Sequence, residues 1–424
     1  MTGHGLDLIR LPKRVFGLAV FLLSLFMAEC ACATPLDCTM PIRLAVDRWL
    51  LDQKPSGFMP YGFDFLEGKE SEPDSMSAPN LVRQAYAAAV FADYYNSTHD
   101  ERARPALQRL LTAMGRSSLP IGKSKTQALI EKTRILSMPF GRYKITAALD
   151  TLGLLYDPTG SGMLLSPSAD YSNAYTGATA LALLTELRYS QASGHASFSA
   201  LRDSWLDGLL AMRIPGDGFR KFPTSIDTVP YFDGEPWLAL ALYHAIFPHE
   251  SRVDEILPDV DAALMKKYAG DFNFDFFHWG VMAAALRYAD TKDQKFLDFV
   301  KTLTQGFLDY NKAKLKNDNN CALVEGVADA LGAMHNAGEG GSELAQKAHE
   351  WAKAEMTKAM QLQIQPGQTE VVFANAKVVA ARMQGFSGHF RGGIYTFDTQ
   401  VDLTAHCVSA LLKLRRYGLI CAGE

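Results

Sequence analysis

An internal repeat constrains the fold of this chain more than any other feature. The segment GMLLSPSADYSNAYTGATALALL begins at Gly162, and GFRKFPTSIDTVPYFDGEPWLALAL begins at Gly218. Glycine, proline, tyrosine and glycine recur in the same order, and Tyr175 and Tyr231 are 56 residues apart, like the two starting glycines. Each unit reads as a turn-rich loop, an apolar helix and a more amphipathic helix. Such a unit cannot bury its apolar helix alone, so the units must stack or close on one another.

Weaker copies of the unit continue along the chain. The glycines that begin the apolar helices are Gly177, Gly234, Gly280 and Gly326. They are spaced by 57, 46 and 46 residues, and further apolar helices are predicted at 80–94 and 402–417, with a less clear hairpin at 125–156. Alternation of an apolar with an amphipathic helix indicates an inner helix buried on all sides and an outer helix with a wet face. Six or so such hairpins predict an all-α fold, an (α/α)6-type toroid with short β or loop insertions before the inner helices.

The first 33 residues have the pattern of a cleaved signal peptide. Arg10, Lys13 and Arg14 precede a thirteen-residue apolar run, 15–27, and the small residues of 31–33 (Ala-Cys-Ala) supply a cleavage site. The predicted organisation is therefore a signal peptide, 1–33, followed by a single toroid domain, 34–424. We expect a periplasmic or secreted protein with no membrane span after cleavage.

Composition excludes several classes of protein. Lys plus Arg number 42 against 46 Asp plus Glu, a net charge of -4, which argues against binding to nucleic acid. No internal stretch approaches twenty uninterrupted apolar residues, so a polytopic membrane protein is excluded. Charged residues make up 21% and hydrophobic residues 48%, as in an ordinary globular chain.

Four cysteines remain after the predicted cleavage: Cys38, Cys321, Cys407 and Cys421. In an oxidising compartment an even number indicates two disulfides, for which three connectivities are possible. Because a closed ring brings its two ends together, we expect it to allow a bond between Cys38 and Cys421.

Two segments resemble a known superfamily of toroid proteins. They are YFDGEPWLAL at 231–240, and Asn80, Arg83, Gln84 and Ala85 at the head of the first apolar helix. Both look like segments of six-hairpin toroid proteins, a group that includes glycoside hydrolases, polysaccharide lyases and sugar epimerases. No catalytic signature of a single family is matched. The resemblance implies a protein that acts on or binds a polysaccharide or oligosaccharide.

In a toroid of this kind, the residues that begin the inner helices share one cleft. The expected lining is Asn80, Arg83, Tyr175, Asp233, Glu235, Asp275, His278, Trp279, Glu325, Asp402 and His406. Glycoside hydrolysis needs two carboxyl groups, one protonated and one ionised. Glu235 and Glu325 lie on different inner helices, and Asp402 is a third candidate. The competing interpretation is that each caps its helix or pairs with an arginine such as Arg83 or Arg391.

Histidine and tyrosine support a second chemistry in the same cleft. Lyases and epimerases of uronic acids neutralise the carboxylate, abstract the C5 proton and supply an acid. His278, His406 and Tyr175 are the acid and base candidates for this chemistry, with Tyr231, Arg83 and Asn80 in support. A third interpretation is a non-catalytic glycan-binding or assembly protein of an envelope export system.

Aromatic residues crowd two further segments. DFNFDFFHWG at 271–280 contains Phe277 and Trp279, and GFSGHFRGGIYTFD at 385–398 contains Phe390 and Arg391. Sugar rings stack on aromatic faces, so Phe277, Trp279 and Tyr231 are candidates for substrate binding. Alternating phenylalanines at 272–276 are equally typical of a short strand. The glycines of 385–398 predict a mobile loop or hairpin over the cavity.

A zinc site is the last alternative. Cys321 precedes one inner helix and His406-Cys407 lies within another, which resembles the zinc ligands of lanthionine-synthesis cyclases. The residues that flank those ligands in the cyclases are missing here. The favoured prediction is thus an exported glycoside hydrolase with no cofactor and no metal.

Overall fold

The computed structural model describes residues 36–71, 76–121, 161–225, 227–310, 317–373 and 376–421. The chain divides into two units, Met1–Leu36 and Asp37–Glu424, and the description below concerns the second. The signal peptide predicted at 1–33 and the hairpin predicted at 125–156 lie outside the described residues. No helix within the described ranges is long and apolar enough to cross a membrane.

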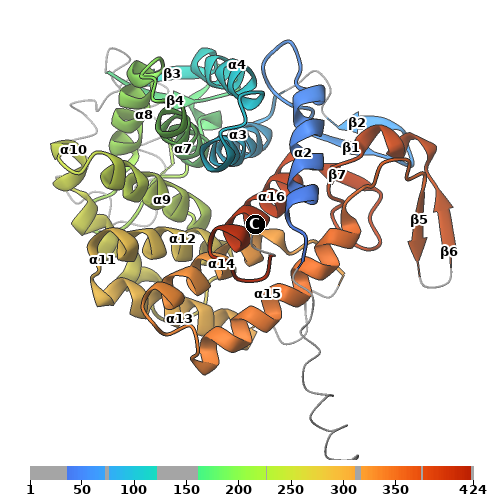
Figure 1. The fold of residues 1–424 in the computed structure, drawn as a ribbon. Coiled ribbons are helices and arrows are strands. Elements are labelled where there is room, and N and C mark those ends of the chain that lie inside the picture. The colour runs from blue at the N-terminus through green and yellow to red at the C-terminus, as the bar shows by residue number, and fades with distance from the viewer. Residues whose placement is uncertain are drawn as a thin grey trace, which may run out of the picture. The chain divides into compact units, whose positions relative to one another are not determined.

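Six apolar helices form a closed inner ring within the described residues (Figure 1). They are α3 (Ala78–Thr98), α7 (Thr176–Ser193), α9 (Pro230–Ile246), α12 (Phe274–Thr291), α14 (Cys321–Asn336) and α16 (Val401–Arg416). Each packs against the next in chain order, and α16 packs against α3. The predicted all-α toroid is confirmed.

Outer helices cover this ring, and most of them are amphipathic as predicted. They are α2 (Thr39–Asp52), α4 (Ala103–Arg116), α8 (Ser199–Met212), α11 (Leu257–Tyr268), α13 (Gln294–Tyr310) and α15 (Glu343–Leu362), with the one-turn α10 (Ser251–Asp254) before α11. Helix α13, for example, buries a stripe from Phe296 to Phe307 and exposes the opposite face. Inner helix α7 buries every residue from Thr176 to Leu187. The first outer helix, α2, packs on the last inner helix, α16, so both ends of the unit contribute to one hairpin.

The repeat glycines mark where neighbouring inner helices approach most closely. A Cβ on Gly326 of α14 would lie 2.8 Å from the Cα of His278 on α12. A Cβ on Gly234 of α9 would overlap Trp279 of α12, and one on Gly177 of α7 would overlap Glu235 of α9. Glycine therefore recurs at these helix starts because the backbone or side chain of the next helix occupies the space of a side chain.

The described residues also contain short strands. Strands β1 (Gly62–Asp64), β2 (Lys69–Ser71) and β7 (Asp398–Gln400) form an antiparallel sheet in the order β2-β1-β7, with Gly62 opposite Gln400. Two antiparallel pairs are β3 (Ser118–Ile121) with β4 (Gly162–Leu165), and β5 (Glu370–Phe373) with β6 (Ala376–Val379). Short 3-10 helices, η2 (Tyr171–Asn173) and η3 (Ala381–Phe386), complete the elements. Strand β7 leads directly into α16, which places this sheet at the N-terminal end of the inner helices.

Two disulfides join distant parts of the unit. Cys38 is bonded to Cys421, as expected for a closed ring, and Cys321 is bonded to Cys407. The second bond links the first residue of α14 to α16, with 4.7 Å between the Cα atoms. The zinc alternative is wrong for this structure, because both thiols that it required are consumed in the disulfide.

Two local predictions are also wrong. The phenylalanines at 272–276 do not form a strand, because Asn273 caps a helix that starts at Phe274. Segment 385–398 is not a loop over the cavity: Phe390 is fully buried and its N–H donates to Thr404 Oγ1 at 3.1 Å. The imidazole of His389 contacts both Asp52 of α2 and Thr404 of α16. The segment therefore fixes α2 against α16.

We predict that Gly326→Ala destabilises the protein by roughly 1–3 kcal/mol, because the added methyl group meets the backbone of α12, which cannot move aside cheaply. Gly270→Ala is the matched control, since a Cβ there has no atom within 4 Å. Urea unfolding of the two variants measures the difference. Equal stabilities would contradict the argument that close helix approach requires this glycine.

Candidate active site

A cavity opens among the first turns of the inner helices, and all six contribute residues to it. About 920 Å³ of empty space lies in and at the mouth of this cavity, part of it open solvent. The predicted residues that line it are Arg83, Tyr175, Tyr231, Glu235, His278, Trp279, Asp402 and His406. Tyr86 and Phe232 also line it, although neither was a candidate. The helices begin at the same end of the ring, so their positive N-terminal ends face this space and favour negative charge.

The two acidic candidates on α9 point in different directions. Residues two apart on a helix point in nearly opposite directions, so Asp233 and Glu235 cannot both face the cavity. Asp233 faces outward, where it accepts hydrogen bonds from the Tyr268 hydroxyl at 2.6 Å and from the backbone N–H of Phe219 at 2.9 Å. Asp233 therefore holds the loop before α9 and does not line the cavity.

Five more predicted substrate-binding or catalytic residues lie elsewhere or at the rim. Phe277 stacks on Phe307 of outer helix α13, with ring centroids 4.4 Å apart. The amide oxygen of Asn80 accepts from Gln84 within α3, and Arg391 donates to backbone carbonyls of its own loop. These three side chains have structural contacts in place of a cavity position. Asp275 is exposed and lies beside the Tyr231 hydroxyl at the rim, and Glu325 lies deeper, as described below.

Glu235 is a buried carboxyl group in the wall of the cavity. It is 3% exposed, and its Oε2 atom has no hydrogen-bond partner. Burial raises the pKa of Glu235 well above its usual value, because a charge there would lose its hydration without gaining a partner. The raised pKa favours the protonated form of Glu235, which can donate to a leaving oxygen.

Asp402, in the first turn of α16, is the contrasting carboxylate of the same cavity. Its Oδ2 atom lies 3.1 Å from Nε of Arg83, whose Nη1 in turn donates to the Tyr61 hydroxyl. The other oxygen, Oδ1, is buried and has no hydrogen-bond partner. The cavity thus holds two carboxyl groups on different helices, one buried without a hydrogen-bond partner and one paired with an arginine.

Glu325 differs from Glu235 and Asp402, because four side chains surround its carboxylate. It accepts from the Tyr86 hydroxyl at 2.5 Å, from Ser409 Oγ and from His406 Nδ1 at 2.8 Å, with Lys413 Nζ at 3.7 Å. Burial would raise the pKa of Glu325, but the charge of Lys413 and the hydrogen bond from His406 outweigh it and hold the pKa at about 2. Glu325 is therefore a fixed anion that orients His406.

His278 and Trp279 complete the wall on α12. Burial and the nearby His406 lower the pKa of His278 to about 3, so its imidazole is neutral at pH 7. Its Nε2 atom and the Trp279 Nε1 atom are both buried without a hydrogen-bond partner. Together with Glu235 Oε2 and Asp402 Oδ1, they are four buried polar atoms of cavity-lining residues for which the described part of the chain supplies no hydrogen-bond partner.

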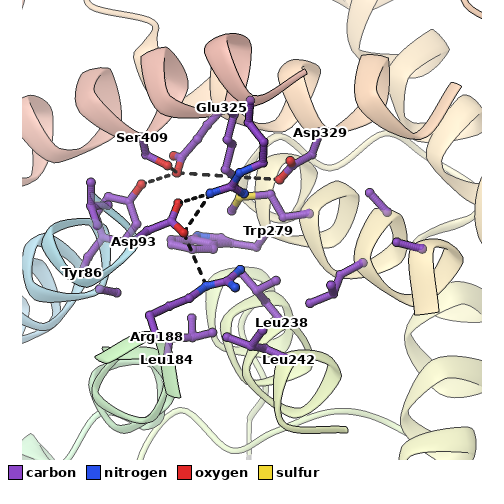
Figure 2. Close-up of a pocket in the computed structure, with 18 of the residues that line it drawn as sticks. Tyr86, Asp93, Leu184, Arg188, Leu238, Leu242, Trp279, Glu325, Asp329 and Ser409 are labelled. Atoms are coloured by element: carbon purple, nitrogen blue, oxygen red, sulfur yellow. Dashed lines mark hydrogen bonds and ion pairs between the residues drawn. The ribbon is translucent and has the colours of Figure 1, made fainter. Parts of the chain in front are cut away.

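A second cavity lies beneath the first, among later turns of the same helices (Figure 2). Its charged groups are paired: Asp93 with Arg188 and Arg416, and Asp329 with Lys413. The sequence interpretation missed these residues and Tyr86. A signal was available, because polar residues recur at spacings of three or four on helices that are otherwise apolar, as in Glu325 and Asp329.

Comparisons with known proteins agree with the architecture. No family model matches the chain, and no curated protein sequence matches it. Among solved structures, an inactive variant of the alpha-1,6-mannanase GH76A of Salegentibacter sp. HEL1_6, in complex with alpha-1,6-mannotetrose, aligns with a TM-score of 0.55 at 10% identity, covering 89% of this chain and 98% of that one. The chain therefore has the fold of that enzyme, the six-hairpin α/α toroid.

Two further neighbours act on different glycans. A GH76 alpha-mannanase of Bacteroides thetaiotaomicron has a TM-score of 0.56 at 10% identity, covering 90% of this chain and 96% of its own. An unsaturated glucuronyl hydrolase specific for heparin has a TM-score of 0.54 at 10% identity, covering 91% and 99%. At this identity the likeness establishes the fold, and the chemistry has to come from the residues of this chain.

We predict that Glu235→Gln stabilises the protein at neutral and alkaline pH. The unfolded chain releases this proton near pH 4.5, whereas the folded protein retains it, so the free energy of unfolding falls as the pH rises above that value. The amide cannot ionise, so the variant should gain on the order of 1–3 kcal/mol at pH 8 relative to the native chain, and little at pH 4.

Glu186→Gln is the matched control. Glu186 is fully buried on α7, and burial raises its pKa to about 7, but it faces Arg202 of α8 and not the cavity. Urea unfolding at pH 4 and pH 8 should show the same sign for both variants. A Glu235→Gln variant that is less stable than the native chain at pH 8 would show that Glu235 is ionised in the folded protein.

Proposed function

We propose that the protein is an exported glycoside hydrolase in which Glu235 is the general acid and Asp402 is the base or nucleophile. The observation that carries the proposal is the contrast between the two carboxyl groups. Glu235 is buried without a hydrogen-bond partner, and burial raises its pKa, whereas Asp402 is paired with Arg83. Hydrolysis of a glycosidic bond requires such a pair, one acid and one carboxylate, in one cavity.

The surroundings of the pair support a sugar substrate. Tyr86, Tyr175, Tyr231 and Trp279 line the same cavity and present aromatic faces on which sugar rings stack. The structural neighbours include enzymes named for hydrolysis of alpha-1,6-mannan, one of them bound to an oligosaccharide. We extend glycan binding to the cavity of this chain as part of the proposal.

Export is part of the proposal as well. The signal peptide pattern at 1–33 predicts secretion to the periplasm or beyond, and two disulfides among the described residues suit an oxidising compartment. We place the single toroid domain at 34–424. A polysaccharide of the envelope or the surroundings is the proposed substrate.

A second candidate function is elimination or epimerisation of an acidic glycan, and the orientation of His406 favours it. Nδ1 of His406 donates to Glu325, which leaves the lone pair on Nε2 able to accept a proton. Tyr175 and Tyr231 bring hydroxyl groups to the same cavity. Burial and Asp275 raise the pKa of Tyr231, so its hydroxyl is a proton donor at neutral pH.

A paired assay on neutral and acidic polysaccharides tests the proposal. Reducing ends and the ultraviolet absorbance of unsaturated uronides are followed in the same reaction. We expect reducing ends alone, and we expect Glu235→Gln and Asp402→Asn each to lower kcat by roughly 10²–10⁴-fold, the usual contribution of such groups. Activity should fall as the pH rises through the raised pKa of Glu235, because the acid loses its proton.

Glu186→Gln serves as the activity control, since it makes the same chemical change outside the cavity and should leave kcat unchanged. Absorbance that rises together with the reducing ends would reject hydrolysis in favour of elimination through His406. Glycan binding with no turnover on any substrate would instead identify a glycan-binding protein of an envelope export or assembly system.

A further inference from the structure

Resting on the proposed function, we infer that the disulfide between Cys321 and Cys407 is a positioning element of the cavity. It fixes the first turns of α16, which carry Asp402 and His406. Each half-cystine is next to a residue of the cavity wall, since Ala322 follows Cys321 and His406 precedes Cys407. The two half-cystines are buried, at 1% and 0% exposure. The bond therefore lies behind the part of the wall that α14 and α16 form.

Helix geometry explains how one bond can position two functional groups. Asp402 and His406 are separated by one helical turn, a spacing that places side chains on the same face, and both line the cavity. Cys407 follows His406 directly, so its side chain is rotated by about 100° from that face, towards α14. A bond from Cys407 to α14 thus sets both the rotation and the axial position of α16.

The bond occurs at a junction that has no close glycine contact. Gly177, Gly234 and Gly326 each approach the next inner helix so closely that a side chain there would overlap it. Helix α16 contains no glycine, and it is joined to the first residue of α14 by the disulfide. The two helices are also separated in sequence by α15 and the long connection 363–400. The covalent bond therefore sets the spacing that glycine contacts set at three other junctions.

The α14 end of the bond is itself held by hydrogen bonds. The backbone N–H of Cys321 donates to Asn319 Oδ1 at 3.0 Å, and Asn319 Nδ2 donates to the carbonyl oxygen of Arg391 at 3.0 Å. One turn into α14, Glu325 accepts from His406 Nδ1 at 2.8 Å. The disulfide and this hydrogen bond are two links between the same helices, one turn apart. The covalent link limits the distance that the hydrogen bond has to bridge.

The other disulfide provides a matched control, because it holds α16 near its opposite end. Cys421 lies beyond the last residue of α16, and its partner Cys38 precedes α2. The sequence separation of this pair is 383 residues, against 86 for Cys321 and Cys407. In the chain-entropy account, loss of the longer link costs at least as much stability. A difference in function between the two losses therefore reports position and not stability.

The first test compares Cys321→Ala/Cys407→Ala with Cys38→Ala/Cys421→Ala in the polysaccharide assay, below the temperature at which either unfolds. Loosening the first turns of α16 displaces Asp402 relative to Glu235. We expect kcat to fall by roughly 10–100-fold in the first double variant and to stay within about twofold of the native value in the second. An equal fall in both, or no fall in the first, overturns the inference.

A second variant covers the case in which the alanine pair does not fold. Cys321→Ala/Cys407→Val restores part of the buried volume without the bond, and we expect the same fall in kcat. Urea unfolding gives the stability of every variant. A loss of kcat that follows stability across all the variants would also overturn the inference.

The second test needs no substrate, because it follows the Nδ1–H proton of His406 by NMR. Glu325 accepts this proton in the native chain, so its exchange with water should be slow. We expect exchange to accelerate tenfold or more in Cys321→Ala/Cys407→Ala and to stay at the native rate in Cys38→Ala/Cys421→Ala. His406→Asn assigns the resonance. Equal exchange rates in the three proteins would show that the bond does not position His406.

The two readouts separate this inference from the proposed function. A native protein that hydrolyses no polysaccharide would reject the proposed function, and the exchange rates would then decide whether the disulfide positions His406. Equal kcat values for the native protein and Cys321→Ala/Cys407→Ala would retain hydrolysis and reject the positioning role.

Discussion

The close approach of neighbouring inner helices at their first turns is the contact on which the rest of this structure depends. Glycine at the repeat positions lets α14 pack directly on the backbone at His278 and lets α9 pack on α7. The same contact creates the chemistry of the cavity, because the carboxyl group of Glu235 is pressed against Gly177 and loses its hydration. A wider ring would leave Glu235 in water and ionised at neutral pH. Helix packing and acid strength therefore have one cause.

The interior of the ring is divided electrostatically along its axis. In the half described by Figure 2, each buried charge has a partner of opposite sign, as with Asp93 between two arginines and Asp329 beside Lys413. In the half at the helix N-termini, polar atoms of Glu235, Asp402, His278 and Trp279 are unsatisfied. Unsatisfied buried groups reduce stability, so they persist where a ligand makes use of them. Glu325 lies between the two halves, where it is near Lys413 and accepts a hydrogen bond that orients His406.

Sequence reasoning reached the architecture because the repeat is a property of the whole chain. Helix order, the inner and outer pattern and the alternative of two disulfides follow from periodicity and from the cysteine positions. That Glu235 lines the cavity and Asp233 does not could not be foreseen, because the rotation of α9 about its axis depends on packing with α7 and α12. The role of Glu325 was equally out of reach, since His406 and Lys413 approach it from another helix, 81 and 88 residues further on. Segment 385–398 was misjudged because its glycines indicate flexibility only when nothing packs against them.

The bond between Cys38 and Cys421 gives the folded unit the topology of a covalent circle. A single backbone cut in any loop between these cysteines leaves all the atoms in one molecule, with the new ends held by the neighbouring hairpins. One nick would relocate the chain ends without releasing a fragment, a useful property in the protease-rich extracellular setting that we propose for this protein. Loss of the protein by proteolysis would then require two cuts, or one cut together with reduction of the bond.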